Sequence, residues 1–116
     1  MPIMIIGLIL GIIAGIFTPI AVPPEFSLYF AVAILAALDT VFGGITAYLL
    51  EKFDLKIFMS GFFGNAVLAA LLTYLGDKLG VQLYYAAIFT FGTRIFQNFA
   101  VIRRILLNKY TKKGNI

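Results

Sequence analysis

The chain has 116 residues, of which 62% are hydrophobic and 12% charged, and its nine Lys and Arg outnumber its five Asp and Glu. This charged fraction is about half that of a soluble domain, so the composition excludes an ordinary soluble protein and indicates an integral membrane protein. Cysteine and histidine are absent, which excludes disulfides, thiolate chemistry and the usual zinc and haem ligands.

Four apolar stretches reach the length of about 20 residues that is needed to span a bilayer. The polar segments between them are too short to hold a soluble domain. We therefore predict an all-α, polytopic membrane helical bundle of four transmembrane helices, at about 3–22, 26–50, 57–75 and 81–102. Residues 1–107 form the transmembrane domain, and residues 108–116 form a basic cytoplasmic tail.

The first stretch is expected to be a retained helix. It lacks the positively charged region that begins a signal peptide, and no small-x-small cleavage site follows it. Gly7, Gly11 and Gly15 recur every four residues, so they form a stripe on one face. Such a stripe lets another helix approach closely, within the protomer or between protomers. Pro19 and Pro23-Pro24 then predict a tight, extended connection.

The later stretches contain polar and small residues at helical spacing. The second contains Asp39 and Thr40, with glycines about one turn further on. The third combines Gly61 with Asn65 on one stripe, and the fourth places Arg94, Gln97 and Asn98 on one face. The predicted intramembrane polar network is Asp39, Thr40, Asn65, Arg94, Gln97 and Asn98. The predicted helix-packing glycines are Gly7, Gly11, Gly15, Gly43, Gly44, Gly61 and Gly64.

Asp39 and Arg94 are the two charges that lie inside long apolar runs. A charge at the centre of a membrane helix costs about 2.5–3.5 kcal/mol on insertion scales. Because their signs are opposite, we expect each to be the partner of the other. A weak sequence repeat at an offset of 55 residues aligns the two positions. The repeat either reflects two tandem, parallel helical hairpins or is a coincidence in a chain of biased composition.

The polar network has two interpretations. It is either a satisfied internal network that fixes the register of the helices, or part of a path for an ion, a proton or a substrate. Catalysis is not expected, because Ser27 and Ser60 have no histidine to activate them and no phosphate-binding loop or metal-ligand spacing occurs. We accordingly expect a protein that is not an enzyme and has no cofactor and no metal.

The basic residues predict the orientation. With four spans, Lys52 and Lys56 share a side with the C-terminal segment, and Lys78 lies on the other, so both termini are expected in the cytoplasm. In a three-span arrangement, with 81–102 on the membrane surface, the basic residues are again unequally distributed between the two sides, but in the opposite sense. The distribution of basic residues therefore leaves both arrangements open. Nucleic acid is excluded as a partner of so short a tail. Residues expected to meet anionic lipids or an acidic partner are Arg103, Arg104, Lys109, Lys112 and Lys113.

Several segments resemble signature segments of the bacterial small basic protein family, and the resemblance runs from about Met1 to Leu107. They are Leu35–Gly44, Ser60–Asn65, Leu75–Val81, Arg94–Asn98 and Ile102–Arg104. The resemblance implies a small multi-pass protein of the bacterial cytoplasmic membrane with no established biochemical activity. It also implies a link to cell division or envelope assembly, because genes of the family tend to lie beside genes of that machinery.

Two functional hypotheses follow. In the first, the chain is a non-enzymatic accessory or scaffold component that forms a homo-oligomer through its glycine stripes and contacts division or envelope membrane proteins. In the second, it is a small oligomeric channel or transporter in which the Asp39/Arg94 pair handles an ion or an anionic solute.

Overall fold

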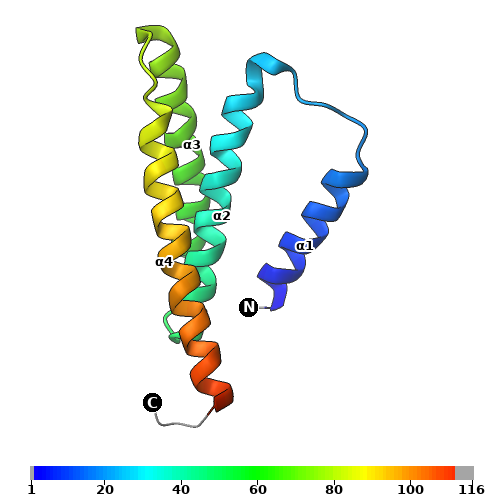
Figure 1. Cartoon of the computed structure of the whole chain (residues 1–116), viewed down its shortest axis with the longest axis vertical. Coiled ribbons are helices and arrows are strands. Elements are labelled where there is room, and N and C mark those ends of the chain that lie inside the picture. Colours follow the sequence, from blue (N-terminus) through cyan, green and yellow to red (C-terminus); the bar gives the residue numbers. More distant parts are fainter. Residues whose placement is uncertain (1, 112–116) are drawn as a thin grey trace.

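The computed structural model describes residues 2–111 and shows four α-helices and one short 3-10 helix (Figure 1). None of the described residues forms a strand, so the all-α prediction is confirmed. The helices are α1 (Pro2–Phe17), η1 (Pro24–Phe26), α2 (Ser27–Leu49), α3 (Leu55–Leu79) and α4 (Tyr84–Thr111).

Two segments are long and apolar enough to cross a membrane: Pro24–Leu49 and Leu55–Leu79. Four transmembrane helices are therefore not shown by length and hydropathy. Helix α1 has 16 residues and ends at Phe17, before the predicted end at Val22, because Pro19 disfavours helical backbone at Thr18. Helix α4 is long enough, with 28 residues, but its arginines and Lys109 make it less apolar.

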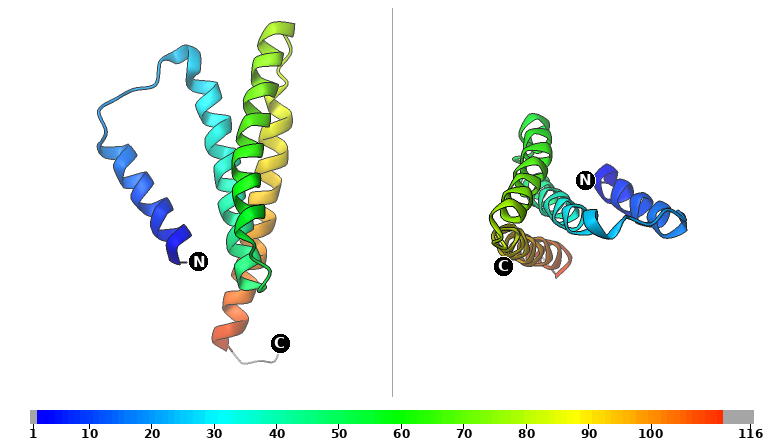
Figure 2. Two further views of the ribbon diagram at one scale, coloured as in Figure 1. Left: turned by 180° about the vertical axis from the view of Figure 1, so that it is seen from behind. Right: turned by 90° about the horizontal axis from the view of Figure 1, so that it is seen from above.

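Helix α2 is the centre of the molecule. Both α3 and α4 pack along it, whereas α3 and α4 contact each other far less. Helix α1 stands apart from these three, and the segment 18–23 joins it to η1 (Figures 1 and 2). The N-terminal end of α1 does approach α2, since Met4 lies beside Gly44. Of the two interpretations of the repeat, two tandem hairpins gain no support from the packing, because α2 packs with α3 and α4 rather than with α1.

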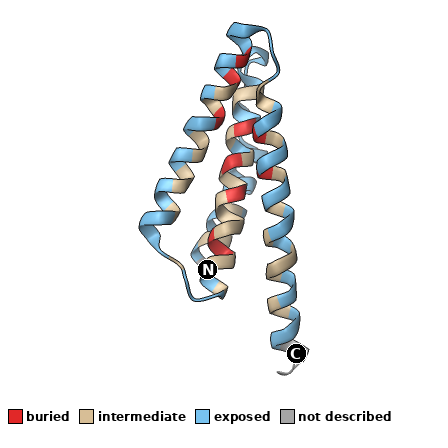
Figure 3. Ribbon diagram, turned by 90° about the vertical axis from the view of Figure 1, so that its left-hand side faces the viewer, coloured by how far each residue is buried: buried red, intermediate tan, exposed pale blue. Residues whose placement is uncertain are grey.

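The buried core consists mainly of small residues. It is formed by Val32 and Ala36 of α2, Ala69 of α3, and Ala87 and Phe91 of α4. Alanines at these positions let the helix backbones approach closely. The buried residues of α3 all lie in its second half, from Ala69 to Gly76, and Figure 3 shows this distribution along the helices. Helix α2 also has buried residues near its other end, Gly44 and Ile45, so it is α3 and α4 that are packed against the core mainly at the end where they are joined.

The turns hold the two ends of this bundle. Asp54 caps α3 and accepts hydrogen bonds from the backbone N–H groups of Lys56, at 2.9 Å, and Ile57, at 3.4 Å. At its other end α3 stops at Gly80, whose φ of 71° is left-handed. There the Tyr29 hydroxyl donates to Asp77 Oδ2 at 3.2 Å, which joins the start of α2 to the end of α3.

Candidate functional site

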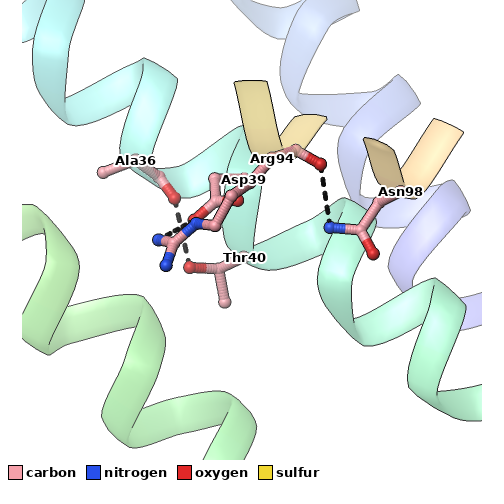
Figure 4. A network of polar contacts seen from close by, with 5 residues as sticks. All are labelled: Ala36, Asp39, Thr40, Arg94 and Asn98. Atoms are coloured by element: carbon pink, nitrogen blue, oxygen red, sulfur yellow. Dashed lines mark hydrogen bonds and ion pairs between the residues drawn. The ribbon is translucent and has the colours of Figure 1, made fainter. Parts of the chain in front are cut away.

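The two charges of the long apolar runs meet within the helical bundle. Arg94 Nη2 of α4 donates to Asp39 Oδ2 of α2 at 2.5 Å (Figure 4). The two side chains differ in exposure, since that of Asp39 is 6% exposed and that of Arg94 is 45% exposed. A buried carboxylate is thereby neutralised by a guanidinium group that still reaches the surface of the protein.

The neighbouring polar side chains do not extend this pair into a closed network. The Thr40 hydroxyl donates to the backbone oxygen of Ala36 at 3.1 Å, and Asn98 Nδ2 donates to the backbone oxygen of Arg94 at 3.0 Å. Both bonds stay within their own helix, four residues back. Asn65 forms no side-chain hydrogen bond with the described residues, and Gln97 is exposed. The sequence alone could not distinguish these local bonds from bonds between helices.

A cleft of about 310 Å³ leads to the ion pair. Its floor is α2 and its walls are the first half of α3 and the middle of α4. Five of the six predicted polar residues line it, namely Asp39, Thr40, Asn65, Arg94 and Asn98, whereas Gln97 does not. The cleft extends to the turn between α2 and α3, where Lys52 and Asp54 line it.

Lys52 and Asp54 were not predicted as site residues. They lie in a polar turn, where charged residues are ordinary, and the sequence assigned Lys52 to membrane orientation only. The apolar wall residues Ile57 and Phe58 were also missed. Only the divergence of α3 from α4 brings this turn and the ion pair into one cleft, and no spacing in the sequence encodes that divergence.

The predicted packing glycines differ in their surroundings. A Cβ built on Gly44 would lie 2.7 Å from Phe58 Cδ2, so a helix packs tightly there. A Cβ on Gly43 would meet only Asn98 Nδ2, at 3.9 Å. The remaining five have no atom of the described residues within 4 Å of such a Cβ: Gly7, Gly11, Gly15, Gly61 and Gly64. Their faces are therefore open in a single chain.

The basic end of α4 projects beyond the rest of the bundle (Figure 1). Arg103, Arg104 and Lys109 are exposed there. Lys109 also borders a hollow of about 540 Å³ together with Tyr48 and Glu51. Lys112 and Lys113 lie outside the described residues. Among residues 2–111, no acidic side chains gather into a group that could hold a metal ion.

The fold and the site define a class of small, basic, all-helical protein with an ion pair inside its apolar bundle. Comparison with known proteins places the chain further: residues 22–107 match the family described as protein of unknown function (DUF1290). The chain is 53% identical to the small basic protein of Bacillus subtilis (strain 168) over 107 residues, which cover 92% of this chain and 88% of that one.

The chain is also 49% identical, over 87 residues, to an uncharacterized protein of Mycobacterium tuberculosis (strain H37Rv), with 73% of this chain and 72% of that one covered. An uncharacterized protein of Mycobacterium bovis matches to the same extent. No solved structure matches the chain. The chain therefore belongs to the small basic protein family that the sequence motifs indicated.

Proposed function

We propose that this chain is a multi-pass protein of the bacterial cytoplasmic membrane, with both termini in the cytoplasm. In this topology α1 to α4 all cross the bilayer, although α1 is short. Its 16 residues extend roughly 24 Å, so the bilayer must thin locally or the segment 18–23 must complete the span. Lys52, Lys56 and the basic end of α4 then share the cytoplasmic side, as the positive-inside rule requires.

Within the membrane we propose a non-enzymatic accessory or scaffold role. The observation that carries it is α1, an apolar helix whose side chains from Ile9 to Phe17 are all exposed and whose glycines have no atom of the described residues within 4 Å of a built Cβ. In lipid, helices associate through close packing at small residues. Gly7 and Gly11 border an apolar hollow of about 590 Å³ between α1 and the rest of the bundle, which the described residues leave unfilled and which a helix of another chain is suited to occupy.

The partners proposed are a second copy of this chain and membrane proteins of cell division or envelope assembly. The homo-oligomer is supported by the open glycine faces of α1 and α3. The link to division or envelope assembly is supported by the family relationship alone. Anionic lipids are the proposed contact of the basic end of α4, because each basic residue near such a surface contributes roughly 1 kcal/mol.

Site-specific photo-crosslinking in native membranes tests this role. A photoreactive residue is placed at Leu10 or Ala14, which are exposed on α1 and lie beside the glycine stripe, three residues after Gly7 and Gly11. We expect discrete adducts with a second copy or with other membrane proteins, identified by mass spectrometry. The same residue at Leu35, which packs against the core, serves as a control and is expected to react only within the chain. Adducts with lipid alone at positions 10 and 14 would contradict the proposal.

A channel or transporter is the second candidate, and the cleft that reaches Asp39 and Arg94 favours it. In this version the pair handles an ion or an anionic solute. Flux into liposomes is expected from the purified protein, and Asp39→Asn is expected to abolish it while the protein still folds. If the purified protein conducts nothing while Asp39→Asn assembles normally, this second candidate fails.

A further inference from the structure

The cleft between α3 and α4 contains both carboxylates and cations. The carboxylates are occupied by hydrogen bonds within the protein, whereas the cations have donors free to bind a ligand. Four charged residues line the cleft: Asp39, Lys52, Asp54 and Arg94. The Asp39 carboxylate is buried and accepts from Arg94, and the Asp54 carboxylate accepts from two backbone N–H groups of α3. Both carboxylates are therefore engaged in holding the fold together.

The two cations are differently placed. Arg94 forms one side-chain hydrogen bond with the described residues, through Nη2, so most of its N–H donors are free. Its side chain is 45% exposed. The Lys52 side chain is exposed and forms no hydrogen bond or ion pair with any residue of 2–111. The accessible charge of the cleft is thus positive at its inner end and at its mouth.

The cleft also offers uncharged hydrogen-bonding groups and room. The side chain of Asn65 and the amide oxygen of Asn98 have no hydrogen-bond partner among the described residues. Gly61 lines the wall, and a Cβ there would meet nothing within 4 Å. A volume of about 310 Å³ is many times what one water molecule needs, so a small molecule or a lipid headgroup fits.

From this arrangement we infer that the cleft is a binding site for an oxyanion of the phosphate or carboxylate type, with Arg94 as its principal ligand. The planar guanidinium group matches the paired oxygens of such an anion. Lys52 attracts the anion at the mouth, and Asn65 and Asn98 supply neutral hydrogen bonds beside Arg94. The apolar wall of Ile57 and Phe58 accommodates a hydrocarbon portion.

The cleft is closed on one side of the ion pair. On the far side of the ion pair, Val32, Ala36 and Phe91 are packed against α3 with almost no exposure. On the near side, the cleft extends to the turn between α2 and α3, roughly 15 Å from Asp39 along α2. In the proposed topology this mouth is cytoplasmic. The inference concerns binding alone, so it does not depend on the scaffold role or on transport.

Binding is tested with the full chain purified in an uncharged detergent. Inorganic phosphate is titrated by calorimetry, and nanodiscs of phosphatidylcholine with a minor fraction of phosphatidylglycerol are compared with phosphatidylcholine alone by native mass spectrometry. We expect one anion per chain. Saturable binding of phosphate identifies a soluble anion as the source, and retention of phosphatidylglycerol identifies a lipid headgroup.

Two matched pairs of variants locate the site. Gly61→Leu fills the cleft and is expected to abolish binding, whereas Gly64→Leu, on the same helix and equally open but outside the cleft, is expected to leave it unchanged. Lys52→Gln is expected to weaken binding about twofold at low salt, the effect of losing a charge that attracts the anion from a distance, and Lys56→Gln, which lies outside the cleft, is expected to have no effect. Thermal unfolding confirms that each variant is folded. Absence of stoichiometric binding of both probes, or equal binding by Gly61→Leu and Gly64→Leu, overturns the inference.

Discussion

At the scale of single residues, the ion pair is asymmetric. Asp39 is buried and has Arg94 as its one charged partner among the described residues, whereas Arg94 is half exposed and keeps contact with the cleft and with the ring of Phe91, 5.5 Å from its Cζ atom. The buried charge of Asp39 is therefore compensated mainly by Arg94, whereas the charge of Arg94 is also in contact with the surface of the protein. Removing the arginine leaves a buried, uncompensated carboxylate, and this uncompensated charge is the main reason why breaking such a pair destabilises a protein.

Arg94→Ala is expected to lower the folded yield and the free energy of unfolding by about 3 kcal/mol, the low end of the range for a broken buried pair, because Arg94 is half exposed. The double variant Asp39→Arg with Arg94→Asp is expected to recover part of this loss. Thermal unfolding in detergent measures both. Arg104→Ala, at an exposed position of the same helix, is the control, and a loss of similar size there would show that the pair has no special role.

At the scale of helices, two adjacent glycines of α2 have opposite surroundings. Both border the cleft, but Gly44 is buried against Phe58 of α3 and Met4 of α1, whereas a Cβ at Gly43 would meet only Asn98 Nδ2. Contact between α2 and α3 near their shared turn thus depends on the missing side chain at Gly44. Gly43 instead keeps the cleft wide.

Gly44→Val is expected to destabilise the bundle by about 1–3 kcal/mol, because the added carbons overlap the ring of Phe58. Gly43→Ala is expected to change stability by less than about 0.5 kcal/mol, the usual range at sites without a packing constraint. Thermal unfolding of the two variants side by side checks the difference. Equal melting temperatures would mean that α3 shifts freely against α2.

Helix α1 gives a separate prediction, because its stripe is open. Gly7→Leu with Gly11→Leu is expected to leave the melting temperature of the bundle unchanged, since a Cβ at either position meets nothing within 4 Å. The same change is expected to reduce the adducts from Ala14, beside the stripe, severalfold in native membranes, because bulky residues prevent close helix approach. A lower melting temperature with unchanged adducts would show instead that the stripe packs within the chain.

The sequence predicted those features that depend on local pattern and failed for those that depend on helix placement. The apolar runs predicted four helices, and Pro19 already contained the reason for the early end of α1. Opposite charges in apolar surroundings predicted the partnership of Asp39 and Arg94. The amides were different, because Asn98 can bond its own helix as easily as another. The central position of α2 depends on which helices pack against which. The spacing of small and polar residues along one helix face does not specify this.

At the scale of the whole molecule, the charges lie at the two ends of a bundle whose longest dimension is 53 Å. The turn between α2 and α3 and the C-terminal end of α4 lie at one end, and the turn between α3 and α4 lies at the other (Figure 1). Lys52 and Lys56 belong to the first turn and the start of α3, and Lys78 belongs to the last turn of α3, before Gly80. Helix α3, which separates Lys56 from Lys78, has 25 residues and extends roughly 37 Å, more than the roughly 30 Å of a hydrocarbon core. The molecule is thus long enough to place both sets of charges in water.

Single-cysteine variants test the topology, and the natural absence of cysteine makes the background clean. With four spans, a membrane-impermeant maleimide added outside spheroplasts is expected to label Lys78→Cys and not Lys56→Cys or Lys109→Cys. After lysis all three are expected to react. Labelling of Lys109→Cys together with Lys78→Cys from one side would instead establish the three-span arrangement.

The detachment of α1 from the other helices also bears on how such a chain is put together. The family match covers residues 22–107, which span α2, α3 and most of α4, and this part of the chain already contains the ion pair and the cleft. Three crossings leave the two ends of a chain on opposite faces of a bilayer, and four bring them to the same face. In the proposed topology, then, α1 makes the number of membrane crossings even. A chain that began at residue 22 would cross three times, and its first residue would lie on the other side of the membrane.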